Sequence, residues 1–228
     1  VAIDNTGGVV ISGAVTASGT VEVTAHSPLT VTSTGTVTAG SDVTLTATPG
    51  ATGGTLVVAG SVSSAGGVIE LGGSTVILAT TSEVTATDGG TVLLGAFGTQ
   101  GDIIQHGGLI SASGDVVMLA DRNVNLNGQI NADGELAVLA GFNQLATAGG
   151  NILLGATSSV TAGDISLTAD RDTGTGAFST GNVSQQAGST LQTGNDFLIN
   201  ASGNIDMLGT VVGNAAGRTN LLAGFNNT

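Results

Sequence analysis

One phrase recurs along this chain, and it constrains the fold more than any other feature. The phrase is a turn glycine, a short strand beginning with Val, Ile or Leu, a small or polar kink, and a second alternating strand ending in Ala or Gly. Self-similarity at a period of 20–50 residues is typical of solenoid and other repeat architectures. The best copies are GAVTASGTVEVTA from Gly13, GTVTAGSDVTLTA from Gly35, GLISASGDVVMLA from Gly108 and GQINADGELAVLA from Gly128.

Looser copies fill the rest of the chain. They are GSVSSAGGVIELG from Gly60, SEVTATDGGTVLLGA from Ser82, SSVTAGDISLTA from Ser158, GSTLQTGNDFLINA from Gly188 and GTVVGNAAGRTNLLA from Gly209. One apolar residue of the first strand of each copy marks its position, and successive markers are 20 to 31 residues apart. The repeat unit is therefore about 20 residues with tolerated insertions. The markers are Val15, Val37, Val62, Val84, Ile110, Ile130, Val160, Leu191 and Val211.

Within a unit, apolar and polar residues alternate with the period of two that a β-strand requires. In the copy from Gly35, the apolar set predicted to point inward is Val37, Ala39, Val43, Leu45 and Ala47. The threonines between them are predicted to point outward. Between the paired strands lies a third short apolar run, such as PLTVTS from Pro28, STVILAT from Ser74, DRNVNLN from Asp121 or GNIDMLG from Gly203.

Three short strands per unit predict an all-β fold, a right-handed parallel β-helix of about nine to ten coils of roughly 20–30 residues each. No long window carries apolar residues at helical spacing, so a fold with helical crossovers between parallel strands is excluded. The predicted core comprises Val15, Val37, Val43, Leu45, Val62, Val84, Ile110, Ile130, Leu136, Val160 and Val211. Asparagine ladders are a further source of stability for such stacked coils.

Composition agrees with a thin, elongated core. The chain has 39 Gly, five Phe, and no Trp, Tyr or Cys, so few side chains could fill a globular interior. A hydrophobic fraction of 40% argues against disorder, because disordered chains are poor in apolar residues. We expect residues 1–228 to form a single β-helix segment, an internal fragment of a longer rod, because open coils at both ends would expose strand edges.

The charge balance limits the partners. Sixteen acidic residues face three Arg and no Lys, for a formal net charge of −13. Binding to nucleic acid depends on clustered Lys and Arg, so nucleic acid is an unsuitable partner. No apolar run reaches the length of a membrane helix, so membrane insertion is not expected. The absence of Cys excludes disulfides and thiolate chemistry.

The repeat phrase resembles that of the filamentous haemagglutinin family of two-partner-secreted bacterial adhesins, and autotransporter passengers use similar coils. The resemblance rests on Gly108–Ala120, on Gly128–Ala140 and on LAGFN, which occurs from Leu139 and from Leu222. It implies an extracellular or cell-surface rod that acts in attachment, biofilm cohesion or presentation of a distal tip. It also implies two kinds of partner, an outer-membrane transporter for secretion and a surface receptor or polysaccharide bound through the parent protein. The family's NPNG-type secretion motif is absent, which favours the repeat shaft.

Few residues are arranged for catalysis, and we expect no enzyme, no catalytic residue and no bound cofactor. His26 and His106 lie eighty residues apart and have no neighbouring His or Cys, which argues against a zinc site. The alternative functions that remain open are a β-helix that binds or degrades polysaccharide and an ice-binding β-solenoid. The first would need clustered carboxylates and stacking aromatics. The second would need unbroken Thr-x-Thr rows, such as Thr36/Thr38, Thr44/Thr46 and Thr85/Thr87.

Asp170 and Asp172 form the one candidate metal site. Two carboxylates at alternate positions followed by glycine resemble the start of a calcium loop, although no later Asp, Asn or Glu completes the pattern. A salt-bridged or solvated turn is the competing interpretation. The related Asp121-Arg122 pair favours it, because Arg can neutralise neighbouring Asp side chains.

Overall fold

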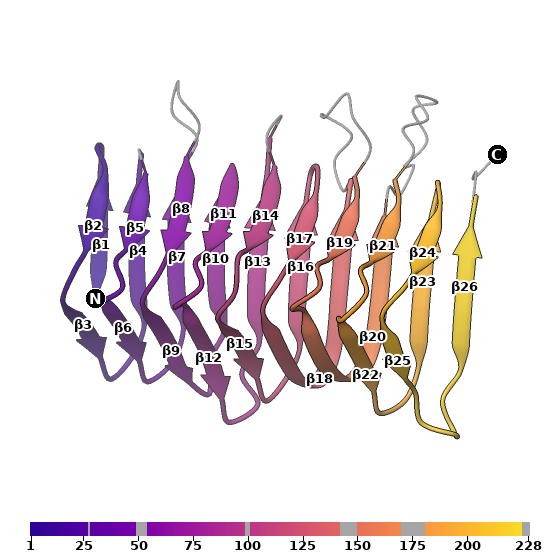
Figure 1. Ribbon diagram of the computed structural model, residues 1–228. Helices are drawn as coiled ribbons and strands as arrows, with labels where there is room; N and C mark the ends of the chain where they lie inside the picture. The colour runs from indigo at the N-terminus through magenta and orange to yellow at the C-terminus, as the bar shows by residue number, and fades with distance from the viewer. Residues whose placement is uncertain (27, 49–53, 99–100, 142–149, 170–180, 225–228) are drawn as a thin grey trace.

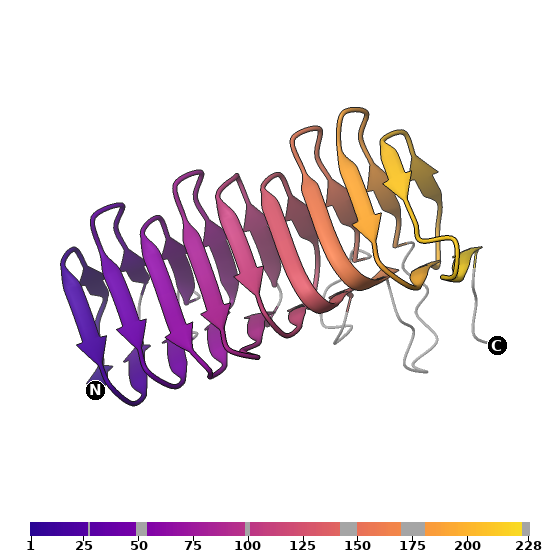
Figure 2. The same ribbon diagram turned by 90° about the horizontal axis from the view of Figure 1, so that it is seen from below.

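The computed structural model describes residues 1–26, 28–48, 54–98, 101–141, 150–169 and 181–224. These residues form a parallel β-helix in which every strand pairs with the equivalent strand of the next coil. The coils follow one another in chain order along a single axis, with the two ends of the chain at opposite ends of the molecule (Figures 1 and 2). The all-β fold predicted from the repeat is confirmed.

Each coil has three sides, which we call the first, second and third faces in the order in which the chain forms them. The first face contains β1 (Ala2–Asn5), β4 (Val21–Ala25), β7 (Val43–Ala47), β10 (Ile69–Gly73), β13 (Val92–Ala96), β16 (Val116–Ala120), residues 135–140 of β18 (Gln129–Ala140), residues 164–169 of β20 (Ser159–Ala169), β23 (Phe197–Ala201) and β26 (Thr219–Ala223). The second face contains β2 (Val9–Ile11), β5 (Leu29–Val31), β8 (Thr55–Val58), β11 (Thr75–Leu78), β14 (Asp102–Gln105), β17 (Val124–Leu126), β19 (Ile152–Leu154), β21 (Val183–Gln185) and β24 (Ile205–Met207). The third face contains β3 (Ala14–Ala17), β6 (Thr36–Ala39), β9 (Ser61–Ala65), β12 (Glu83–Thr87), β15 (Leu109–Ala112), the first residues of β18 and β20, β22 (Thr190–Thr193) and β25 (Thr210–Val212).

Two long strands join the first and third faces. β18 and β20 pass through the corner between these faces without a break, and their pairing shifts in register between Ala132 and Glu135. Because of them, the two faces form one continuous sheet of seventeen strands among the described residues, beside a nine-stranded sheet on the second face. The nine strands of the second face are separated by eight steps, so the described residues make about eight turns, slightly fewer than predicted.

The repeat markers lie in register on the third face. Val15 pairs with Val37, Val62 with Val84, and the same column continues through Ile110, Ile130, Val160, Leu191 and Val211. Most of the unequal spacing in sequence is absorbed at the connection between the first and second faces. The two long intervals, 130 to 160 and 160 to 191, carry their extra residues between β18 and β19 and between β20 and β21, and most of these residues lie outside the described ranges.

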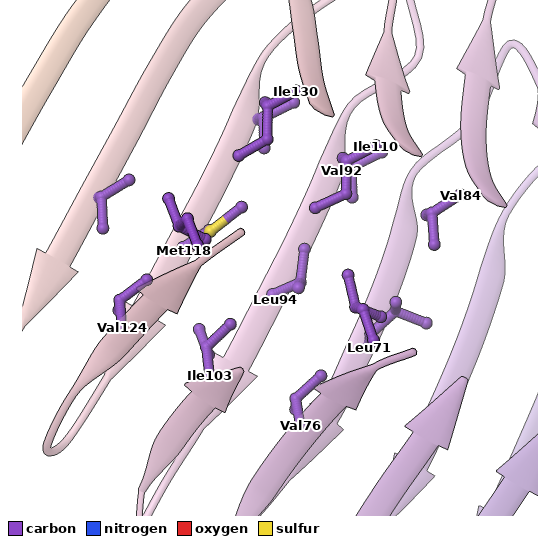
Figure 3. Packing of buried hydrophobic residues seen from close by; sticks show 14 of the residues in the cluster. Leu71, Val76, Val84, Val92, Leu94, Ile103, Ile110, Met118, Val124 and Ile130 are labelled. Carbon is purple, nitrogen blue, oxygen red and sulfur yellow. The ribbon is translucent and has the colours of Figure 1, made fainter. Parts of the chain in front are cut away.

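The interior is a stack of apolar rows. Leu71, Leu94 and Met118 project inward from successive strands of the first face, opposite Val76, Ile103 and Val124 of the second face and Val84, Ile110 and Ile130 of the third (Figure 3). Each row repeats at the strand spacing of about 4.8 Å, so a side chain packs on its counterparts above and below. Full burial of a Val, Leu or Ile side chain contributes about 1.5–3 kcal/mol, which makes these rows the main source of stability.

Most of the predicted core is buried, and one member is not. The residues found fully buried are Val37, Val43, Leu45, Val62, Val84, Ile110, Ile130, Leu136 and Val160. Val15 is partly buried and packs against the core. Val211 is in register but 40% exposed, so its predicted burial is wrong. It belongs to β25, which pairs only with β22, so one side of its side chain has no neighbouring coil.

No helix long and apolar enough to cross a membrane occurs in the part of the chain that the structure describes.

Replacement of Ile130 by Asp tests the stacking of the core. Ile130 is fully buried between Ile110 and Val160, so a carboxylate there would lose its hydration without gaining a partner. We expect the free energy of unfolding to fall by about 3–5 kcal/mol, measured by urea denaturation. The control is Thr161→Asp, which adds the same charge at an exposed position on the same face and should change stability by less than about 0.5 kcal/mol. Equal losses in the two variants would contradict the inward orientation of Ile130.

Candidate functional site

Of the residues singled out from the sequence as possible sites, the structure describes the two histidines but not the two aspartates. Asp170 and Asp172, the calcium candidates, lie outside the described residues. His26 and His106 are both exposed, on different coils, and His26 Nε2 lies 3.7 Å from Asp4 Oδ1. Among the described residues, no three His, Cys, Asp or Glu side chains are grouped to hold a metal ion.

The most organised polar structure lies where the first face turns into the second, which we call the ladder corner. Here one asparagine from each of four successive coils stacks directly on the next. The backbone N–H and the Nδ2 of Asn151 both donate to Asn123 Oδ1 at 3.1 Å. Asn182 donates in the same way to Asn151 Oδ1 at 3.0 and 3.1 Å. The backbone N–H of Asn204 continues the ladder to Asn182 Oδ1 at 2.8 Å.

Asp102 ends this asparagine ladder on the N-terminal side. Its Oδ1 accepts from the backbone N–H of Asn123 at 3.0 Å and from Asn123 Nδ2 at 3.1 Å. Arg122 approaches from the following coil, where its Nε donates to Asp102 Oδ1 at 2.8 Å and a terminal nitrogen contacts Oδ2. Two donors facing two carboxylate oxygens form the bidentate geometry typical of strong Arg–carboxylate pairs.

The Asp121-Arg122 dipeptide therefore differs from the expectation that Arg122 neutralises its neighbour. Arg122 pairs with Asp102, one coil away, while Asp121 is buried and only 1% exposed. Asp121 Oδ2 accepts from the backbone N–H of Gly98 at 2.6 Å, and its Oδ1 is buried without a hydrogen-bond partner among the described residues. Adjacent acidic and basic residues thus have separate environments.

The pKa values of the two aspartates at the ladder corner, Asp102 and Asp121, are shifted in opposite directions. Burial of Asp102 tends to raise its pKa, but the hydrogen bond and charge of Arg122 and the donors of Asn123 outweigh burial and hold the pKa below its ordinary value of 3.8. Burial raises the pKa of Asp121, which only the Gly98 N–H opposes. The hydrogen bond from Arg122 to Asp102 likewise raises the pKa of the guanidinium.

A second polar column follows the corner where the third face turns into the first, which we call the acidic corner. Asp115, Glu135, Asp164 and Asp196 occupy it on successive coils. Asp115 Oδ1 accepts from the backbone N–H of Glu135 at 2.8 Å, and Asp164 Oδ1 accepts from that of Asp196 at 2.9 Å. Arg218 ends the column, with its Nε 3.6 Å from Asp196 Oδ2. These backbone hydrogen bonds stabilise carboxylates that stack about 4.8 Å apart.

The outward residues of the third face are mainly hydroxyls and amides. Ser63 Oγ donates to Thr38 Oγ1 of the adjacent coil at 3.1 Å. The threonine pairs do not form one continuous array, because Thr44 and Thr46 belong to the first face and other coils carry different residues on the third. Successive coils of the third face present Thr36/Thr38, Ser61/Ser63, Glu83/Thr85, Leu109/Ser111, Gln129/Asn131 and Ser159/Thr161.

Chemically, the ladder corner immobilises polar groups. Each carbonyl oxygen of the ladder from Asn123 to Asn182 accepts at least one donor of the next coil, and Asp102 is occupied by Arg122 and Asn123. A general base needs a carboxylate that is free to accept a proton from substrate. The carboxylate oxygens of Asp102 already accept hydrogen bonds from Arg122 and Asn123. The arrangement supports rigidity of the corner.

The chain matches no family model, and searches of the curated proteins and of the solved structures find no match. Its fold and its stacked polar columns define a parallel β-helix repeat protein.

Removal of a middle rung tests the asparagine ladder. Asn151→Ala deletes two hydrogen bonds accepted by its Oδ1 and one donated by its Nδ2. At about 1 kcal/mol net for each bond, we expect the free energy of unfolding to fall by about 2–4 kcal/mol, measured by urea denaturation. Asn125→Ala, on the outward row of the neighbouring strand, is the control and should change it by less than about 0.5 kcal/mol. A ladder that contributes nothing would leave the two variants equally stable.

Opposite pH dependences are expected for the two aspartates of the ladder corner. The low folded-state pKa of Asp102 stabilises the fold above its unfolded value of 3.8, and this contribution is lost as pH falls through the folded-state pKa. Asp102→Asn should therefore lower the free energy of unfolding at neutral pH by about 1–3 kcal/mol, with a difference from the parent that shrinks below pH 3.8.

The raised pKa of Asp121 has the reverse effect. The folded state is favoured below the unfolded value of 3.8, and this advantage is lost as pH rises through the folded-state pKa. Asp121→Asn should raise the free energy of unfolding at neutral pH by about 1 kcal/mol, and the gain should disappear towards pH 3.8. Denaturation curves of both variants and the parent from neutral pH to pH 3 measure the two slopes; parallel slopes would show that one direction is wrong.

Proposed function

We propose that this chain is a non-catalytic shaft segment of a secreted or cell-surface bacterial adhesin of the filamentous haemagglutinin-like kind. The observation that supports the proposal is the continuous parallel pairing of three strand columns along the described coils. Each coil contacts only its neighbours, so stability and length accumulate along the axis. Such a structure holds its two ends a fixed distance apart.

Three further features support a mechanical role. Apolar rows run through the interior of the described coils, with Gln105 and Gln185 as buried polar members of one row on the second face. The asparagine ladder adds hydrogen bonds along the same axis. The net charge of −13 keeps the surface soluble and opposes lateral association of copies. Secretion through an outer-membrane transporter and attachment to a receptor or polysaccharide belong, in this proposal, to the parent protein.

Deletion of one coil in register tests the shaft role. Ala14 pairs with Thr36, so deletion of residues 14–35 joins Gly13 to Thr36 and should preserve the stacking while shortening the rod by about 4.8 Å. In the parent protein displayed on cells, we expect attachment to stay within about twofold of the parental level. A control that replaces the same residues with a flexible Gly/Ser linker should reduce attachment, since it interrupts the rod.

Surface display must be quantified by antibody in every strain. Loss of attachment in the one-coil deletion at parental display would mean that these residues bind the target directly, and the shaft role would be wrong. Full attachment by the Gly/Ser strain would show that stiffness is not required.

A further inference from the structure

The outward side of the first face carries an apolar patch. Leu93 pairs with Val117, and Val117 with Ala137, to form one row on β13, β16 and β18. A second row, two residues further along the same strands, contains Leu119 and Leu139. All five side chains are partly exposed on the outer surface. The three strands lie side by side in the middle of the rod (Figure 1).

Phe97 completes the second row. The position next to Leu119 on β13 is Gly95, and a Cβ placed there would lie 2.6 Å from Phe97 Cε2. The ring of Phe97 therefore lies over Gly95 and occupies the space that a side chain would fill, while remaining 43% exposed. We define the apolar patch as Leu93, Phe97, Val117, Leu119, Ala137 and Leu139.

Carboxylates border this patch on two sides. Glu70 precedes Leu93 in the same outward row and is exposed. The acidic corner runs past the beginning of the same strands: Asp115 is two residues before Val117, and Glu135 two residues before Ala137. Two residues of a strand span about 7 Å, within the reach of a Lys or Arg side chain bound on the patch.

Basic side chains of the described residues do not balance these acids. Arg122 is paired with Asp102 at the ladder corner, and Arg218 lies at the far end of the acidic corner beside Asp196. A second copy of the chain would bring the same carboxylates against this surface, and an anionic lipid surface would bring phosphates. Both are disfavoured by like charge.

We propose that the apolar patch and the acidic corner together form a docking surface for a cationic amphipathic polypeptide segment. Apolar side chains of the partner pack on the two rows, and its Lys or Arg side chains pair with Asp115, Glu135 and Asp164. The flat sheet supplies the apolar contact, which gives affinity, and the carboxylate column supplies the charge complementarity, which gives selectivity.

A fluorescently labelled synthetic peptide of alternating Leu and Lys is the probe, and fluorescence anisotropy measures its Kd for the full chain. We expect Leu119→Ser/Leu139→Ser to weaken binding about tenfold or more, because the apolar contact is lost. Asp115→Asn/Glu135→Gln should weaken it about tenfold at low salt and reduce the salt dependence of Kd. A matched control, Ile77→Ser/Ile104→Ser, removes two outward apolar residues of the second face and should leave Kd within about twofold.

Two further peptides separate the two contributions. Alternating Ser-Lys lacks apolar side chains and alternating Leu-Glu reverses the charge, so both should bind at least about tenfold more weakly than Leu-Lys. Circular dichroism and melting check that each variant keeps its fold, and Val117→Thr is a milder apolar variant should the double one unfold.

Three outcomes would overturn the proposal. The first is a Kd insensitive to both patch and corner variants, which would indicate non-specific attraction to an acidic protein. The second is an equal loss in the second-face control. The third is a dimer in sedimentation that Leu119→Ser/Leu139→Ser dissociates, which would make a second copy the occupant.

Discussion

The structure depends on one constraint: the backbone amides of the strands pair with carbonyls of the neighbouring coils in a parallel register. A residue is therefore always stacked on the same few residues of neighbouring coils, and a shift by one position would turn every inward side chain outward. Columns must be chemically self-compatible. The interior satisfies this with apolar rows such as Leu71, Leu94 and Met118, in which the residues differ but their volumes allow stacking. Residues within one column can therefore differ as long as they stack, whereas an apolar column cannot exchange its residues with a polar one.

Polar columns meet the same constraint in two different ways. An asparagine carries both donor and acceptor, so identical rungs such as Asn123 and Asn151 satisfy each other, and the ladder can continue without charge. A carboxylate carries only acceptors, so an acidic column must borrow backbone N–H donors, as Asp115 does from Glu135. Asp102 stands at the junction, where it accepts from the first asparagine and needs Arg122 to balance its charge. In these two columns, charge therefore occurs where the asparagine ladder begins and along the acidic corner.

The core and the three-stranded coil could be predicted from sequence because they depend on local alternation and on the repeat. The nine marker residues from Val15 to Val211 lie in one column, as their positions in the repeat predict. Val211, however, lacks the second neighbouring coil that burial requires.

The ladder corner could not be predicted in the same way. The contact between Asp102 and Arg122 can be predicted only when the register of the coils is known. Insertions of variable length between the first and second faces hide that register in the sequence. A signal was present nonetheless: Asn or Asp directly precedes Val or Ile in Asp102-Ile103, Asn123-Val124, Asn151-Ile152 and Asn182-Val183. The burial of Asp121 could not be predicted, because nothing in the Asp121-Arg122 dipeptide distinguishes it from a solvated turn.

The same register that fixes the interior also arranges the exterior. Outward side chains contribute little to stability. They nevertheless lie in rows about 4.8 Å apart, because their strands have this spacing. Leu93, Val117 and Ala137 thus form a flat apolar row with a carboxylate column beside it, without a dedicated loop or pocket. The proposed docking surface depends only on outward residues of a few adjacent coils, and the fold tolerates changes there because the inward alternation is untouched. Stiffness and recognition are therefore compatible in one chain: the inward half of each strand maintains the rod, and the outward half is free to select a partner.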